Sequence, residues 1–145
     1  TPYQAYKCQD GYLIIAAPNN RMFARLNEVL DRNEWTEDPR FTSNPLRWDH
    51  QDLLCEMIES VTTTQPREYW QDKLEKAGIP NAPIQDIGQA VEHPQTEALG
   101  IVQETEDGRF KLMGMPLQFD GVRPKQRKGA PELGEHTEEI FGRKA

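Results

Sequence analysis

The stretch that most constrains the fold of this chain is residues 77–84, Ala-Gly-Ile-Pro-Asn-Ala-Pro-Ile. Gly78 accepts positive φ without a steric penalty, which suits it to the first position beyond a helix C-terminus. The two prolines of the stretch lack an amide hydrogen, so a helix cannot continue through them. The stretch therefore predicts that one helix ends at this glycine and that a rigid connector leads to a second helical segment near Asp86.

The sequence also predicts two β-hairpins. Each pairs two short runs of strand-forming residues around an Asp-Gly dipeptide, because glycine adopts the turn conformation that such hairpins need. The first comprises residues 3–8 and 12–17 around Asp10-Gly11, and the second comprises residues 101–105 and 110–113 around Asp107-Gly108. Residues 12–17 are apolar on both faces, which predicts an interior strand.

Apolar residues recur at helical spacing in three segments of the first half of the chain. We expect a helix after a cap at Asn19-Asn20, a second helix over residues 47–61, and a third that starts with Thr64 or Gln65 as its N-cap. A shorter helix follows, with a capping box formed by Asp86 and Gln89. These signals predict an α+β fold with a small antiparallel sheet, built from the two hairpins, about four helices and an extended C-terminal tail.

The charge balance narrows the possible partners and location of the protein. The net charge of −7 argues against general binding to nucleic acid or to an anionic membrane, which needs a positive face. No apolar run approaches the roughly 20 residues that span a bilayer. The two cysteines, Cys8 and Cys55, show no paired spacing, so we expect free thiols in a reducing cytoplasm.

Nothing in the sequence forms a complete catalytic or metal-binding pattern. His50 and His93 have no nucleophile nearby in the sequence, and their surroundings favour a solvated helix position and a helix cap, respectively. No glycine-rich phosphate loop and no metal-ligand spacing is present. The basic run over residues 123–128 favours a tethering surface loop over a phosphate site. We therefore predict no catalytic residue and no metal ligand in this chain.

An ordered set of short motifs runs through the chain. The motifs are residues 2–7 with 10–16, 38–41 followed by Asn44 and Arg47, 77–84, 93–95, 114–117 and 134–137. Each is weak alone, but the ordered set resembles the C-terminal part of the family III CoA-transferases. That family includes formyl-CoA transferase, carnitine CoA-transferase and α-methylacyl-CoA racemase.

The resemblance implies an enzyme with two domains whose chains interlock into a homodimer. It implies a large α/β domain that binds coenzyme A as a substrate and carries a catalytic aspartate, which no residue of this chain matches. Residues 1–121 would be the small domain, and residues 122–145 a linker or tail that leads back to the large domain. The expected partners are this large domain, a second copy, an acyl-CoA and a carboxylic acid, and we expect no cofactor in this chain.

The resemblance also suggests a role for the stretch around Gly78. Its members Gly78, Ile79, Pro80, Asn81 and Pro83 are predicted to form one wall of the acyl-substrate pocket, with a rigid helix-to-helix turn kept for packing as the alternative. Some family members fold a glycine-rich loop over the active site. This chain has only Asp10-Gly11 in the corresponding region, which argues against formyl-CoA transferase itself.

Both ends of the chain suggest a fragment of a longer polypeptide. We therefore expect exposed apolar surface near residues 115–119 and in the C-terminal segment, where a large domain would cover it. Two alternatives stay open: a fragment of an α-methylacyl-CoA racemase-like enzyme, and a free-standing acidic interaction module without catalysis.

Overall fold

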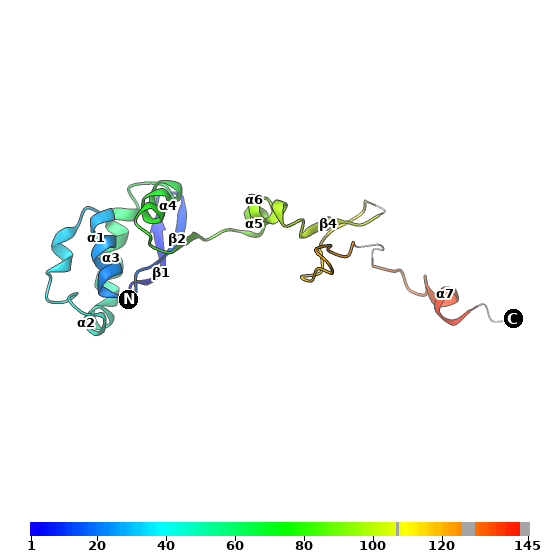
Figure 1. Cartoon of the computed structure of the whole chain (residues 1–145), viewed down its shortest axis with the longest axis horizontal. Coiled ribbons are helices and arrows are strands. Elements are labelled where there is room, and N and C mark those ends of the chain that lie inside the picture. Colours follow the sequence, from blue (N-terminus) through cyan, green and yellow to red (C-terminus); the bar gives the residue numbers. More distant parts are fainter. Residues whose placement is uncertain (107, 126–129, 143–145) are drawn as a thin grey trace. The chain divides into compact units, whose positions relative to one another are not determined.

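The computed structural model describes residues 1–106, 108–125 and 130–142. The chain divides into two compact units, Thr1–Ile84 and Gln85–Ala145, which we call unit 1 and unit 2. Figure 1 shows the elements of both units along the chain. The boundary predicted after residue 121 concerns the domains of a larger enzyme, and it stays a prediction.

A three-stranded antiparallel sheet forms one side of unit 1. Its strands are β1 (Tyr3–Cys8), β2 (Gly11–Ala16) and β3 (Asn81–Pro83), in the order β1-β2-β3. The first predicted hairpin is confirmed, with Cys8 paired to Gly11 across the turn. The two-sided apolar pattern of β2 correctly predicted the central position of this strand.

The sequence analysis missed strand β3. Residues 77–84 were predicted as a connector between helices, whereas Asn81, Ala82 and Pro83 pair with β2. A proline is tolerated there because β3 is an edge strand, where one side of the backbone makes no ladder bonds. A three-residue strand with a proline has no recognisable local signal, because only its partner strand defines it.

The helices of unit 1 include one more break than predicted. They are α1 (Asn20–Val29), the 3-10 helix η1 (Asn33–Thr36), α2 (Asn44–Asp49), α3 (Gln51–Thr62) and α4 (Arg67–Lys76). The single helix predicted over residues 47–61 is wrong. With Ser43 as its N-cap, α2 begins at Asn44, three residues before the predicted start at residue 47. His50 leaves the helical conformation at φ −116° and ψ 27°. Asn19 caps α1, as predicted.

Unit 1 has one continuous apolar core. Helix α3 contacts β1, and helix α4 contacts β2 and β3; Figure 1 shows α3 and α4 beside the β1–β2 hairpin. Full burial of a large apolar side chain stabilises a fold by about 1.5–3 kcal/mol. The largest fully buried apolar side chains are Tyr6, Phe23, Phe41, Leu13, Ile15, Leu26, Leu54, Ile58, Leu74 and Ile79.

A buried arginine ties the loops of unit 1 to this core. The Arg47 guanidinium donates hydrogen bonds to the carbonyls of Thr1 (2.8 Å) and Phe41 (2.9 Å) and to Asn20 Oδ1 (3.0 Å). It also lies 4.6 Å from the centre of the Phe23 ring. Burial lowers the pKa of Arg47, and neutral oxygen acceptors surround its charge. Arg47 therefore holds three separate segments together.

Unit 2 consists of short elements. They are α5 (Ile87–Val91), α6 (Pro94–Ala98), β4 (Val102–Glu104), β5 (Lys111–Met113) and α7 (Thr137–Phe141). The second predicted hairpin is confirmed by the antiparallel pairing of β4 with β5, although Asp107 lies outside the described residues. The capping box of Asp86 with Gln89 and the cap at His93 are also confirmed. With both hairpins present, the predicted α+β class is confirmed.

Unit 2 leaves its large apolar side chains exposed. Among its described residues, Thr105 is the one side chain in the buried class, at 3% exposure. The exposure expected near residues 115–119 and in the C-terminal segment is confirmed by Phe119 at 64% and Phe141 at 81%. The basic run lies partly outside the described residues, which omit Arg127 and Lys128. No helix that the structure describes is long and apolar enough to cross a bilayer.

Candidate functional site

The predicted site begins where helix α4 ends. Gly78 has φ +64° and follows the C-cap residue Ala77. The Gly78 amide donates to the Glu75 carbonyl and the Ile79 amide donates to the Leu74 carbonyl, both at 2.9 Å. These two bonds make the Schellman arrangement, in which a left-handed residue satisfies the last carbonyls of a helix. The glycine predicted to end this helix is confirmed.

The five predicted wall residues differ in their exposure. Ile79 is 2% exposed and belongs to the core of unit 1. Gly78 and Pro80 are exposed, whereas Asn81 and Pro83 are half-buried. Ile79 therefore anchors the stretch, and the other four residues leave part of their surface available to a ligand or to another domain.

Strand pairing fixes the rest of the stretch. The Ala16 amide donates to the Pro80 carbonyl at 2.9 Å, and the Ile84 amide donates to the Tyr12 carbonyl at 2.9 Å. Between these bonds, Asn81 lies opposite Ile15. The stretch thus includes strand β3 between helices α4 and α5 and is not a plain turn, and both its role as a pocket wall and the alternative role in packing stay predictions.

An arginine from α1 covers the end of α4. Arg25 Nη1 donates to the Ala77 carbonyl at 3.0 Å, 52 positions away in the sequence. A cation at a helix C-terminus is favourable because the helix dipole is negative there. A Cβ atom at Gly78 would lie 3.4 Å from Arg25 Nη1. Sequence analysis missed Arg25, since nothing in its local pattern distinguishes it from a solvated helix residue.

A second arginine joins the start of α4 to the far end of the stretch. The Arg67 amide donates to Asp10 Oδ1 at 2.8 Å, its Nε lies 3.3 Å from Asp10 Oδ2, and its Nη1 donates to the Ile84 carbonyl at 2.8 Å. The hydrogen bonds to Asp10 lower the pKa of its carboxyl group, and the bond from the Arg67 backbone amide has the largest effect. A Cβ atom at Gly11 would lie 3.0 Å from Arg67 Cζ, so a side chain at this position would shift the Arg67 guanidinium.

Asp10 replaces the N-cap that the sequence predicted for α4. The N-cap residue is Pro66, not Thr64 or Gln65, and it offers no side-chain cap. The Asp10 carboxylate accepts the first amide of the helix from the hairpin turn, 57 positions away. A helix N-terminus favours a negative charge, so this arrangement satisfies both the amide and the dipole.

The titratable groups of unit 1 do not form an activated nucleophile. Burial raises the pKa of Cys8 to about 11 and also raises the pKa of Cys55, so both thiols are protonated at neutral pH. Hydrogen bonds from Arg40 hold the pKa of Asp38 at about 2. Across the described ranges no Asp or Glu side chain is in the buried class, and no group of three or more His, Cys, Asp or Glu could hold a metal ion.

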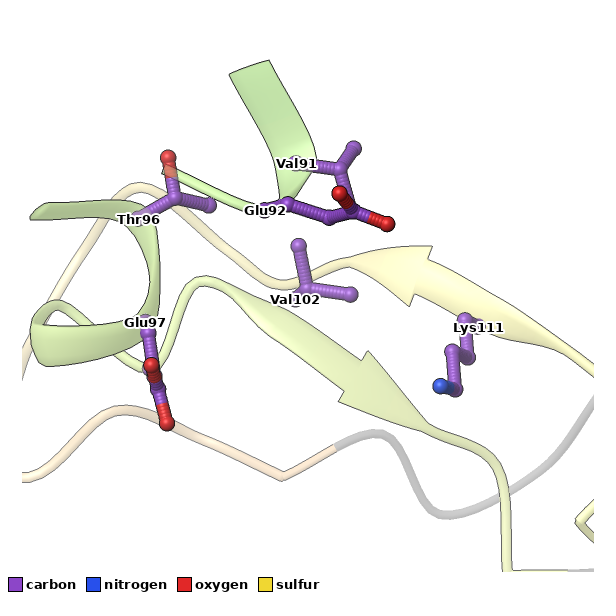
Figure 2. Close-up of a pocket in the computed structure, with 7 residues that line it drawn as sticks. Val91, Glu92, Thr96, Glu97, Val102 and Lys111 are labelled. Atoms are coloured by element: carbon purple, nitrogen blue, oxygen red, sulfur yellow. The ribbon is translucent and has the colours of Figure 1, made fainter. Parts of the chain in front are cut away.

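Unit 2 contains an open groove that the sequence did not predict. Its volume is about 410 Å³, and it is lined by Val91, Glu92, Thr96, Glu97, Gly100, Val102 and Lys111. Figure 2 shows two carboxylates and one ammonium group around Val102. The Thr96 hydroxyl donates to the Ala90 carbonyl at 2.7 Å. The lining thus offers charged groups on a shallow surface, without a thiol or an imidazole.

Comparisons with known proteins match nearly the whole chain. The model of CoA-transferase family III matches residues 1–137. The acetyl-CoA:oxalate CoA-transferase of Acetobacter aceti is 33% identical over 135 residues, which are 92% of this chain and 34% of that protein. The human succinyl-CoA:glutarate CoA-transferase is 28% identical over 143 residues, which are 97% of this chain and 33% of that protein.

A solved structure has the same fold. The crystal structure of a CAIB/BAIF family protein from Brucella suis aligns with a TM-score of 0.85 and 30% sequence identity, over 97% of this chain and 37% of that chain. The chain therefore spans about a third of the length of the curated relatives that it matches.

Proposed function

Because the chain belongs to CoA-transferase family III, we propose that it is the small-domain part of an enzyme that transfers coenzyme A between carboxylic acids. The observation that carries this proposal is the family match over residues 1–137. The relatives named above are CoA-transferases, which favours transfer over the racemase-like alternative. The coverage of about a third of each relative favours a part of a larger enzyme over a free-standing interaction module.

In this proposal the chemistry lies outside residues 1–145. A catalytic aspartate of the large domain attacks the thioester carbonyl of the acyl-CoA, so that the C–S bond breaks and the CoA thiolate leaves a mixed anhydride. The thiolate then attacks the aspartyl carbonyl of this anhydride, which releases the acyl group as a carboxylate and leaves an aspartyl-CoA thioester. Coenzyme A is then a substrate of the whole enzyme, and this chain holds no cofactor of its own. The protonated thiols and the exposed carboxylates of the described residues support this division of labour.

The role proposed for this chain is to shape one wall of the acyl-substrate pocket. The wall consists of Gly78, Ile79, Pro80, Asn81 and Pro83. A wall residue must hold its position within fractions of an ångström to discriminate between substrates. The Schellman bonds at one end and the pairing with β2 at the other supply that rigidity.

The first acceptors to test are short dicarboxylic acids. One relative is named for oxalate and another for glutarate, and both names combine the acceptor with an acyl-CoA donor. We propose the same class of acceptor here, with the parent enzyme acting as a homodimer in the cytoplasm. The tail, residues 122–145, would return to the large domain.

The test is a transfer assay on the full-length polypeptide that contains residues 1–145. The enzyme is incubated with acetyl-CoA or succinyl-CoA and with oxalate or glutarate, and the new acyl-CoA is measured by mass spectrometry. We expect exchange by the full-length enzyme and none by residues 1–145 alone. Exchange by residues 1–145 alone, or a full-length enzyme that uses no acyl-CoA with any carboxylic acid, would refute the proposal.

A thermal titration of residues 1–145 with coenzyme A tests whether this part binds the substrate by itself. A ligand present at about 100 times its Kd stabilises a protein by roughly 2.7 kcal/mol. We expect no change in melting temperature. A saturable increase would show that this part of the enzyme binds coenzyme A without the large domain.

A further inference from the structure

The sheet of unit 1 has an outward face that is unusually apolar. In an antiparallel sheet with one solvated face, outward residues are normally polar. Strand β2 departs from this rule. Its inward residues Leu13 and Ile15 are fully buried, but its outward residues Tyr12 and Ile14 are also apolar. The helices account for one apolar face of β2, and the other face has no such partner within unit 1.

The neighbouring strands continue this surface. The register places Ala5 and Ala82 on either side of Ile14. Tyr3 is 70% exposed, Tyr12 is 48% exposed and Ile84 is 46% exposed. We call this surface the outer sheet face, and it consists of Tyr3, Ala5, Tyr12, Ile14, Ala82 and Ile84.

The outer sheet face is also almost free of charge. Lys7, which pairs with Tyr12, is the one charged residue that the register places there. By contrast, the chain as a whole carries a net charge of −7. A largely apolar surface with a single charge, on an otherwise acidic protein, is typical of a surface that packs against another protein.

The edges of the sheet are protected against strand addition. On β1, the Lys7 amide donates to Glu59 Oε1 at 2.8 Å, and the Lys7 carbonyl accepts the Thr62 hydroxyl at 2.6 Å. The opposite edge, β3, has three residues and includes Pro83, which has no amide hydrogen. Short, capped or proline-bearing edges discourage pairing with another strand. A partner would therefore bind through the face of the sheet.

We propose that the outer sheet face is the surface on which the CoA-binding large domain of the parent enzyme packs. This inference rests on the proposed function. The solved relative keeps the fold of this region, with a TM-score of 0.85, inside a chain of which this region covers 37%. Most of that protein thus lies outside the matched region and is available to cover this face. Tyr3 and Tyr12, at opposite ends of the β1–β2 hairpin, then each provide an aromatic ring for this contact.

Hydroxyl-radical footprinting tests this assignment without a mutation. Labelling of Tyr3 and Tyr12 is compared between residues 1–145 alone and the full-length enzyme. Tyr6, on the same strand as Tyr3, is 1% exposed and sets the level of a covered tyrosine. We expect Tyr3 and Tyr12 to react in the isolated chain and to fall to the level of Tyr6 in the full-length enzyme.

Two footprinting results would overturn the assignment. The first is equal labelling of Tyr3 and Tyr12 in the isolated chain and in the full-length enzyme. The second is protection in the isolated chain that disappears on dilution, because a second copy of this chain would then be the occupant. Neither result depends on catalytic activity, so a failed transfer assay would refute the proposed function and leave the footprinting result to decide the packing.

A matched pair of variants gives a second test. Ile14→Glu places a charge in the middle of the outer sheet face, and Leu46→Glu places one at a 36% exposed position on α2. We expect both isolated variants to keep the circular dichroism of the wild type. In the full-length enzyme, Ile14→Glu should restore the labelling of Tyr12 and Leu46→Glu should not. Restored labelling in both variants, or in neither, would contradict the assignment.

Discussion

Unit 1 and unit 2 differ in how their apolar side chains are used. Unit 1 buries its large apolar residues in one core, with Phe23, Phe41 and Leu54 at 2% exposure or less. The described residues of unit 2 include large apolar side chains such as Ile87, which is 85% exposed. A fold is stable by itself only when burial offsets the entropy of ordering the chain. Unit 1 has such a core, whereas the described residues of unit 2 leave most of their large apolar side chains exposed.

The largest expected effect is a difference in stability between the same substitution, Phe→Ala, made in unit 1 and in unit 2. Phe41→Ala removes a fully buried ring from unit 1 and should lower the free energy of unfolding by about 3–5 kcal/mol. Phe141→Ala in unit 2, where the ring is 81% exposed, should change it by less than about 0.5 kcal/mol. Urea unfolding of residues 1–145, followed by tryptophan fluorescence, measures both. Equal losses in the two variants would break the contrast.

The buried arginine should show the next largest effect. Arg47→Met leaves the oxygen acceptors at Thr1, Phe41 and Asn20 without their donor. A buried polar group that loses its partner costs about 1–3 kcal/mol, so we expect a loss near the upper end of that range.

Arg40→Met is the matched control for this variant. Arg40 forms an exposed ion pair with Asp38, and solvent screening makes the contribution of such a pair to stability small. Both variants are compared by urea unfolding. A stability loss for Arg47→Met no greater than that for Arg40→Met would show that the buried guanidinium does not organise unit 1.

Two left-handed glycines provide a smaller and sharper comparison. Gly78 has φ +64° in unit 1, and Gly100 has φ +54° in unit 2. An alanine in this conformation costs about 1–2 kcal/mol. Gly78→Ala should therefore lower the melting temperature of unit 1, because the Schellman turn is part of the cooperative fold. Gly100→Ala should leave that transition unchanged, and a shift of equal size would show that the two units unfold together.

The smallest expected effect is on the pH dependence of stability. The pKa of Asp10 is lowered in the folded protein from its ordinary value of 3.8. Its contribution is therefore fully present above that unfolded-state value and is lost as the pH falls through the lower folded-state pKa. Because Asp10 is largely exposed, we expect this contribution to be less than about 1 kcal/mol.

Asp10→Asn should accordingly flatten the acid side of the stability curve of unit 1. The control is Asp86→Asn, which alters the capping box of α5 in unit 2. Melting temperatures measured from pH 7 down to pH 2 compare the two variants. If the melting temperature at low pH changes in Asp86→Asn but not in Asp10→Asn, this would contradict the role of Asp10 as the cap of α4.

The sequence predictions were right for features set by neighbouring residues and mostly wrong for features set by residues that lie far apart in the sequence. The two hairpins, the helix-ending glycine Gly78 and the capping box at Asp86 depend on neighbouring residues, and all were predicted. Strand β3, the break at His50 and the N-terminal cap of α4 were missed or predicted wrongly. For β3 and for the cap, the deciding partner lies far away in the sequence, on β2 and at Asp10 respectively.

The candidate site shows the same division. Its five residues could be selected from the sequence because two prolines and a glycine are conspicuous, and their role as a pocket wall stays a prediction. Arg25 and Arg67, which hold the two ends of the stretch, could not be selected. Each is an ordinary helix residue until the fold brings it to a carbonyl that is 52 or 17 positions away.

The sequence by itself determined that a helix ends at Gly78, where the hairpins turn and which family the motifs resemble. These features depend on backbone preferences that each residue carries with it. Only the tertiary structure decided that residues 81–83 complete a sheet, that Asp10 caps a distant helix, and that one apolar face of β2 has no covering element within unit 1. The reason is physical: burial and long-range hydrogen bonding are properties of the assembled fold, and no local segment contains them.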